Sequence, residues 1–139
     1  MAYTTKFRVQ HDELLEKAGL IKKALDLEKL KEDGAPMRSL LSELLGKLKI
    51  HLAVEDKALY PQLKKCGNHE VVAISIQYQT DMGGIAEFVA KYSKNWASGM
   101  AISENPQAFI DETNQLLSAL STRINKENNN LYKLADDCL

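Results

Sequence analysis

The segment LSELLGKLKIHLAVEDKALYP, residues 41–61, decides the fold of this protein. Its apolar residues recur every three or four positions, which is the spacing of one face of an α-helix. That face reads Leu41, Leu44, Leu48, His51, Glu55 and Leu59. A histidine and a glutamate therefore stand one turn apart at positions where the pattern calls for apolar residues. The segment predicts an amphipathic helix that buries an imidazole and a carboxylate.

Three further segments show the same periodicity, and each also carries an ionisable residue in its apolar face. The faces read Phe7, His11, Leu14, Ala18, Ile21, Leu25; Ile74, Tyr78, Asp81, Ile85, Phe88, Tyr92; and Leu116, Leu120, Arg123, Glu127, Leu131, Leu134. Turn-forming residues at 34–36, 66–68 and 98–106 separate the four segments. Because the first two connections are short, neighbouring helices should be antiparallel. The sequence predicts an all-α protein with a single domain, residues 1–139, built as an up-down-up-down antiparallel four-helix bundle.

The ionisable residues are expected to lie at one level of this bundle. His51 and Glu55 lie about 14 residues before the turn at Gly67, and Asp81 lies about 14 residues after it. Since a helix rises by about 1.5 Å per residue, equal counts from a turn give equal heights. Counting from the turn at Gly34 places His11 level with Glu55. Counting from the middle of the third turn places Glu127 level with Asp81. Six side chains should therefore converge in the interior: His11, His51, Glu55, Asp81, Arg123 and Glu127.

The chain also contains an internal repeat, in which the second helical segment returns as the fourth. Leu44, Leu45, Leu48, His51, Glu55, Leu59 and Tyr60 return at one constant offset as Leu116, Leu117, Leu120, Arg123, Glu127, Leu131 and Tyr132. The second and fourth helices are thus approximate copies, and a two-fold axis should relate the two helical hairpins. The repeat places Arg123 where the other copy has His51.

Composition excludes several classes of protein. The chain has 18 Lys and Arg residues and 19 Asp and Glu residues, which gives a net charge of −1. It therefore lacks the excess of basic residues expected of a nucleic-acid binder. No apolar run approaches the roughly 18 residues that span a membrane, and the start of the chain shows no secretory signal. We therefore expect a cytoplasmic protein. Two cysteines, Cys66 and Cys138, lack metal-binding spacing, and in a reducing compartment they are expected to be plain thiols.

Three stretches together resemble the hemerythrin family, the HHE cation-binding domains. They are residues 10–14 (QHDEL), residues 51–61 (HLAVEDKALYP) and residues 123–132 (RINKENNNLY), in the family's order. The resemblance implies a four-helix bundle holding a non-haem di-iron site that binds oxygen or senses oxygen, iron or redox state. It also implies that His11, His51, Glu55 and Glu127 are metal ligands. Where the family has further histidines, this chain has Arg123 and, on the third helix, residues such as Tyr78 and Asp81.

Charge arithmetic suggests that the site holds fewer metal ions than the family's. Glu55, Asp81 and Glu127 supply −3 and Arg123 supplies +1, so one divalent cation would cancel the remainder. Arginine has no acceptor atom and does not deprotonate, so Arg123 cannot be a ligand. We interpret it as a substitute for one of two metals. Tyr78 is either a supporting hydrogen-bond donor, a phenolate ligand or simply a core residue.

These features favour a hemerythrin-like protein that binds iron or another divalent metal, as one ion or none, and serves sensing or storage without catalytic turnover. Dioxygen is a further candidate ligand, and the sequence does not reveal whether the protein has a protein partner. One alternative is a metal-free regulatory or interaction bundle, in which Arg123 and the carboxylates replace the metal centre. A redox enzyme with a di-iron centre is a third hypothesis, against which Arg123 argues.

Overall fold

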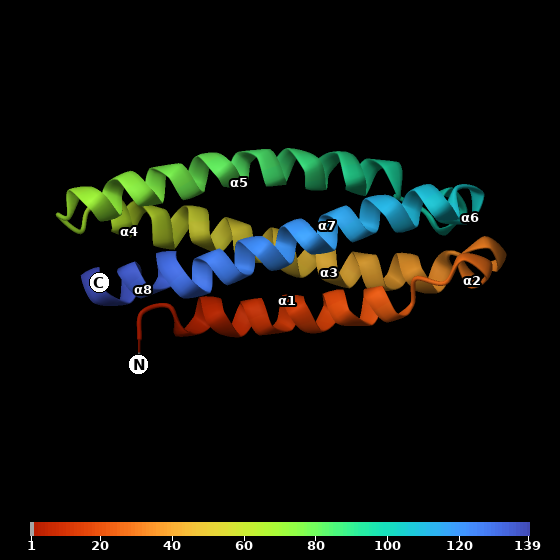
Figure 1. Ribbon diagram of the computed structural model, residues 1–139, viewed down its shortest axis with the longest axis horizontal. Coiled ribbons are helices and arrows are strands. Elements are labelled where there is room, and N and C mark those ends of the chain that lie inside the picture. The colour runs from red at the N-terminus through yellow and green to blue at the C-terminus, as the bar shows by residue number, and fades with distance from the viewer. Residues whose placement is uncertain (1) are drawn as a thin grey trace.

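The computed structural model describes residues 2–139, which form helices without strands. The helices are α1 (Thr5–Lys23), α2 (Leu27–Glu32), α3 (Ala35–Val54), α4 (Tyr60–Lys64), α5 (His69–Asn95), α6 (Gly99–Glu104), α7 (Pro106–Lys126) and α8 (Tyr132–Cys138), with π-helical turns η1 (Glu55–Leu59) and η2 (Glu127–Leu131). The long rods of the structure are α1, α3 continued by α4, α5, and α7 continued by α8, and they lie side by side (Figure 1). The predicted all-α four-helix bundle is confirmed. None of the described helices is both long and apolar enough to cross a membrane.

Short helices fill the two connections at one end of the bundle, where the sequence pattern predicted only turns. α2 lies between α1 and α3, and α6 lies between α5 and α7 (Figure 1). Asp26 and Ser98 begin these short helices, because each side chain accepts a hydrogen bond from a backbone N–H in the first turn. The two connections touch at Gly34 and Gly99, and a Cβ atom at Gly34 would collide with the carbonyl oxygen of Gly99. Glycine is therefore needed at this crossing.

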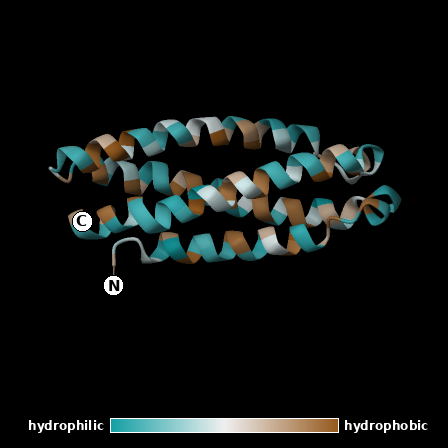
Figure 2. Cartoon of the chain, viewed as in Figure 1, coloured by the Kyte–Doolittle hydropathy of each residue, from teal (hydrophilic) through white to brown (hydrophobic). Residues whose placement is uncertain are grey.

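Two apolar clusters fill the bundle and leave a polar layer between them. Hydrophobic and hydrophilic residues alternate along the long helices, as Figure 2 shows. The cluster toward α2 and α6 includes Leu14, Ile21, Leu41, Leu48, Phe109, Leu116 and Leu120. The cluster toward α4 and α8 includes Phe7, Leu59, Tyr60, Leu63, Leu131, Tyr132 and Ala135. His11, His51, Glu55, Arg123 and Glu127 are buried between the two clusters.

The two π-helical turns occur at equivalent places in the internal repeat. η1 begins at Glu55 and η2 begins at Glu127, so each turn starts at a buried glutamate. Pro61 follows η1, but its counterpart after η2 is Lys133, so the turn does not depend on proline. A π turn adds a residue to the helical repeat and is frequent at functional sites. Here it turns consecutive residues, such as Leu131 and Tyr132, into the interior.

Cys66 and Cys138 form a disulfide, so the expectation of two plain thiols is wrong. Their Cα atoms are 5.9 Å apart, and the residues are separated by 72 positions in the sequence. That separation equals the period of the internal repeat, so the two-fold relation places the cysteines at equivalent positions facing each other. Local spacing contains no signal for this pairing, and the period of the repeat is the sequence feature that could have indicated it.

Candidate metal centre

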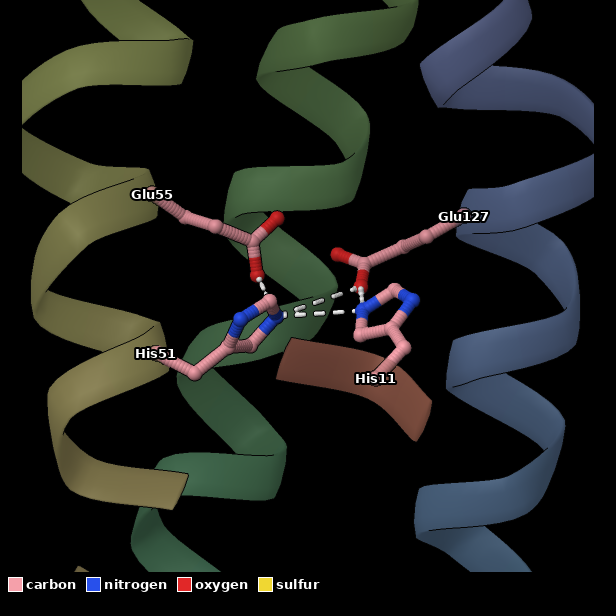
Figure 3. A group of neighbouring side chains, drawn as sticks. All are labelled: His11, His51, Glu55 and Glu127. Atoms are coloured by element: carbon pink, nitrogen blue, oxygen red, sulfur yellow. Dashed lines mark hydrogen bonds and ion pairs between the residues drawn. The ribbon is translucent and has the colours of Figure 1, made fainter. Parts of the chain in front are cut away.

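Four buried side chains from three of the long rods meet in the polar layer. They are His11 from α1, His51 from α3, and Glu55 and Glu127 from the two π turns (Figure 3). One potential ligand atom from each residue lies within 4.8 Å of all the others. The donor set contains two imidazole nitrogens and two carboxylates, which suits divalent iron, manganese or zinc. The structure therefore brings together the four side chains that the family resemblance implied as ligands.

The four side chains are already in hydrogen-bonding contact with one another. Nε2 of His51 lies 2.7 Å from Oε1 of Glu55, and Nε2 of His11 lies 2.9 Å from Oε1 of Glu127. The two Nε2 atoms are 3.1 Å apart. The small space between these groups, also lined by Met82 and Arg123, measures about 10 Å³. Such a volume holds about one water-sized sphere.

Two amide side chains fix how the imidazoles face this space. Nδ1 of His51 lies 2.7 Å from Oε1 of Gln10, and Nδ1 of His11 lies 2.8 Å from Oδ1 of Asn128. Since an amide oxygen can only accept, each Nδ1 carries a proton and donates it, and Nε2 is the nitrogen that faces the centre, where its lone pair would bind a cation once its own proton is lost. Gln10 and Asn128 therefore orient the imidazoles in the tautomer that binds a metal.

Burial and the neighbouring charges shift the pKa values of the cluster in different directions. Burial lowers the pKa of His51, but hydrogen bonds and charges from Glu127 and Glu55 outweigh burial and raise it to about 9. Burial also raises the pKa of Glu55 to about 7, against the opposing effect of His51. Glu127 behaves differently, because hydrogen bonds from His11 and His51 overcome burial and hold its pKa below the ordinary range. Without a metal, protons therefore occupy the cluster near neutral pH.

Arg123 lies beside this group and is held by partners on three sides. Its Nε donates to Oε2 of Glu127 at 3.2 Å, and its Nη2 donates to the Tyr60 hydroxyl at 2.9 Å. Nη2 also donates to the backbone carbonyl of Tyr78 at 2.8 Å, and the guanidinium carbon lies 4.7 Å from the centre of the Tyr78 ring. The positive charge of Arg123 is therefore fixed next to Glu127, although only 6% of the residue is exposed.

The two tyrosines Tyr132 and Tyr78 take different roles. Tyr132 places its hydroxyl 3.1 Å from Nε2 of His11 and donates to Oε2 of Glu55 at 3.3 Å. Burial, followed by the charges of Glu127 and Glu55, raises the pKa of the Tyr132 hydroxyl above its ordinary range. It therefore stays a neutral donor. Tyr78 supports Arg123, while its hydroxyl donates to the carbonyl oxygen of Lys126 at 3.3 Å rather than facing the four donors.

The structure contradicts the expected convergence of Asp81 with the other ionisable residues. Asp81 is exposed and lines a surface groove with Arg123 and Lys126, whereas Met82 is buried and lines the space between the four donors. Both residues are compatible with helical spacing after Tyr78, because the apolar stripe can advance by three or four positions. Burying the thioether of Met82 is much less costly than burying the carboxylate of Asp81.

Met82 is also the counterpart of His11 in the other hairpin. The inward side chains Phe7, His11, Leu14 and Ile21 of α1 match, at one constant offset along the chain, Tyr78, Met82, Ile85 and Tyr92 of α5. The two-fold relation therefore pairs His11 with Met82 and His51 with Arg123. In one hairpin both positions are imidazoles, and in the other neither is. Figure 3 accordingly shows α5 passing behind the cluster without a labelled ligand.

Sequence reasoning missed several residues that shape the site. Gln10 and Asn128 carried no separate signal, although each is adjacent in sequence to a residue of the cluster. Tyr60 and Tyr132 were visible as members of the repeat, but the repeat alone does not show which partner each hydroxyl meets. Met82 was missed because helical spacing allows either Asp81 or Met82 to point inward, and only the packing of α5 decides between them.

Comparison with known families agrees with this geometry. A family model described as the hemerythrin HHE cation binding domain matches residues 3–135, nearly the whole chain. No curated protein and no solved structure gives a significant match.

Proposed function

Because the chain belongs to the hemerythrin HHE cation-binding family, we propose that it binds one divalent cation between His11, His51, Glu55 and Glu127. Iron is the metal we propose first, with dioxygen as a candidate further ligand. The observation that carries the proposal is the convergence of four buried donors within 4.8 Å. We propose sensing or storage in the cytoplasm rather than catalytic turnover.

The chain's own residues support binding of a cation at this site. Gln10 and Asn128 hold both imidazoles with Nε2 toward the centre, and Tyr132 donates a hydrogen bond to Glu55. A bound iron ion would supply a redox-active Lewis acid. The surrounding apolar clusters exclude bulk water from it.

Charge also favours one ion. With Asp81 at the surface, the interior charges are −1 each from Glu55 and Glu127 and +1 from Arg123, a sum of −1 with neutral imidazoles. One divalent cation changes this sum to +1, and two would change it to +3. Burial of unbalanced charge is costly, so the second ion is disfavoured. Arg123 takes the place of that ion beside Glu127.

A metal-free regulatory bundle is the second candidate function, and one observation favours it. The polar layer satisfies its own hydrogen bonds: His11 pairs with Glu127, His51 pairs with Glu55, and Arg123 pairs with Glu127. Such a network can persist without a metal when protons are present. Metal analysis separates the two functions.

We expect purified protein from iron-rich medium to contain about one iron ion per chain or fewer, measured by plasma emission. His51→Ala should abolish the bound iron because it removes a donor and leaves Glu55 without its partner. Asp81→Asn is the matched control, since Asp81 is exposed, and it should leave the iron content unchanged. Two equivalents of iron with an oxo-bridge absorption spectrum would contradict the single-ion proposal. Iron-free protein that also fails to take up Fe²⁺, Mn²⁺ or Zn²⁺ would favour the metal-free bundle.

Arg123→His should raise the number of ions bound in an anaerobic Fe²⁺ titration from one toward two. The substitution removes the internal positive charge and places an imidazole one turn before Glu127, as His51 precedes Glu55. The second ion should bind weakly, since Met82 supplies no imidazole, and the double variant Met82→His/Arg123→His should bind it more tightly. Arg123→Lys keeps the charge and should still bind one ion. Equal stoichiometry in all four proteins would show that Arg123 does not limit the site.

The stability of the metal-free protein should fall as the pH rises from about 5 to 9. The folded-state pKa of His51 is about 9 against 6.5, so its contribution, about 3 kcal/mol, is present below pH 6.5 and is lost as the pH rises through 9. Glu55, with a raised pKa of about 7, loses its contribution between pH 4.5 and 7. The affinity for Mn²⁺ should change in the opposite direction, because the cation competes with these protons. Thermal unfolding and Mn²⁺ titration at each pH test both slopes, and an Mn²⁺ affinity that is flat between pH 6 and 9 would contradict this assignment of protons.

A further inference from the structure

The disulfide lies close in sequence to both carboxylates of the candidate metal centre. Cys66 follows Glu55 at the same spacing along the chain as Cys138 follows Glu127. In each copy of the repeat, the chain passes from the glutamate through a π turn and a short helix to the cysteine. The disulfide therefore joins the two segments that position Glu55 and Glu127, at the end of the bundle where α4 and α8 lie (Figure 1).

Helix α8 connects the disulfide to the cluster through specific contacts. Its first residue is Tyr132, whose hydroxyl lies 3.1 Å from Nε2 of His11 and 3.3 Å from Oε2 of Glu55. Asn128, which accepts a hydrogen bond from His11, lies in η2 immediately before α8. Besides the disulfide, α8 is held by the buried side chains of Tyr132 and Ala135 and by Asp136, which accepts hydrogen bonds from the backbone N–H and hydroxyl of Thr4 at 2.9 Å. Loss of the disulfide leaves α8 attached but less constrained.

We propose that Cys66 and Cys138 form a reversible thiol–disulfide site that controls the metal affinity of the cluster, an inference that rests on the proposed function. Neither residue is fully buried, and both lie at the edge of the apolar cluster rather than inside it, so the site is open to a thiolate from a small dithiol or a reducing protein. Reduction breaks the S–S bond, two electrons and two protons convert the cysteines to thiols, and the dithiol is oxidised to its own disulfide. In a protein expected in the cytoplasm, a disulfide is more often transient or redox-sensing than structural.

Reduction of the disulfide should lower the metal affinity, because α8 and η2 carry the side chains that support the cluster. Reduction removes the covalent link between α8 and the segment that follows α4, so the Tyr132 hydroxyl and the Asn128 amide become less tightly positioned against His11 and Glu55. Loss of such supporting hydrogen bonds typically weakens metal binding by about ten-fold or more. Coupling between two sites is reciprocal. A bound cation should therefore make the disulfide harder to reduce by the same factor by which oxidation tightens cation binding.

The test is an anaerobic titration with Mn²⁺, in which the electron paramagnetic resonance signal of free Mn²⁺ reports the affinity. Mn²⁺ is chosen because thiolates bind it weakly, so the cysteines themselves do not compete. Three samples are compared: the oxidised protein, the protein reduced by a dithiol that is then removed, and the variant Cys66→Ser/Cys138→Ser. Circular dichroism confirms that each is folded at the titration temperature. We expect the Kd for Mn²⁺ to be about ten-fold higher in the reduced protein and in the variant.

Two controls separate coupling from a general loss of stability. Leu30→Ala removes a buried side chain from α2, at the far end of the bundle, and should destabilise the protein without changing the Kd. Reductant should leave the Kd of the double serine variant unchanged. Equal Kd values in the oxidised and reduced proteins would overturn the redox inference while leaving the proposed metal site in place. Absence of Mn²⁺ binding in every sample would overturn the metal site itself, and the inference with it.

Discussion

Replacing Glu127 by alanine should lower the free energy of unfolding by about 3–5 kcal/mol, the largest effect expected from a single substitution at the site. Glu127 is the carboxylate that neutralises Arg123, at 3.2 Å, and it also accepts a hydrogen bond from His11 at 2.9 Å. Its removal leaves a buried guanidinium without a counter-charge. Chemical denaturation of the metal-free protein measures the loss, which avoids the separate effect of a lost metal ligand.

A double variant isolates the ion pair from other consequences of the substitution. Arg123→Met/Glu127→Ala removes both charges, and it should recover much of the stability lost in Glu127→Ala, because apolar replacements of a buried ion pair are often neutral or stabilising. Glu55→Ala is the matched comparison. It leaves the pair of Arg123 and Glu127 intact, so its cost should be smaller. Unchanged stability in Glu127→Ala would mean that Arg123 already reaches water.

Removing the disulfide should cost about 4 kcal/mol of stability, as expected for a cross-link that closes a loop of roughly 70 residues. For a chain of this size, the loss corresponds to a melting temperature lower by about 10–15 °C. The effect should be the same in Cys66→Ser, Cys138→Ser and the double variant, since either single change breaks the bond. Differential scanning calorimetry measures the shift.

The control for this prediction is the reduced wild-type protein. Its melting temperature should match that of the double serine variant, because both lack the same cross-link and keep similar side chains. A melting temperature that is unchanged by reduction, with free thiols verified by labelling, would contradict a stabilising role for the disulfide.

The sequence by itself determined the helical bundle and most of the polar layer. Periodic apolar residues specify helices whatever their neighbours are, and the residue counts from the turns specify the height of each polar interruption. Four of the six side chains expected to converge, His11, His51, Glu55 and Glu127, lie within 4.8 Å of one another, and Arg123 lies beside them. The internal repeat also placed Arg123 at the position equivalent to that of His51.

Only the tertiary structure decided which side chain of α5 points inward and which residues support the cluster. Helical spacing allowed both Asp81 and Met82, and packing selected Met82 because an apolar side chain is less costly to bury. Gln10 and Asn128 contact histidines that lie on other helices. Cys66 likewise meets Cys138 although the two are far apart in the sequence. Periodicity reports the face of one helix, whereas these contacts depend on the rotation and distance between two helices, which the assembled bundle sets.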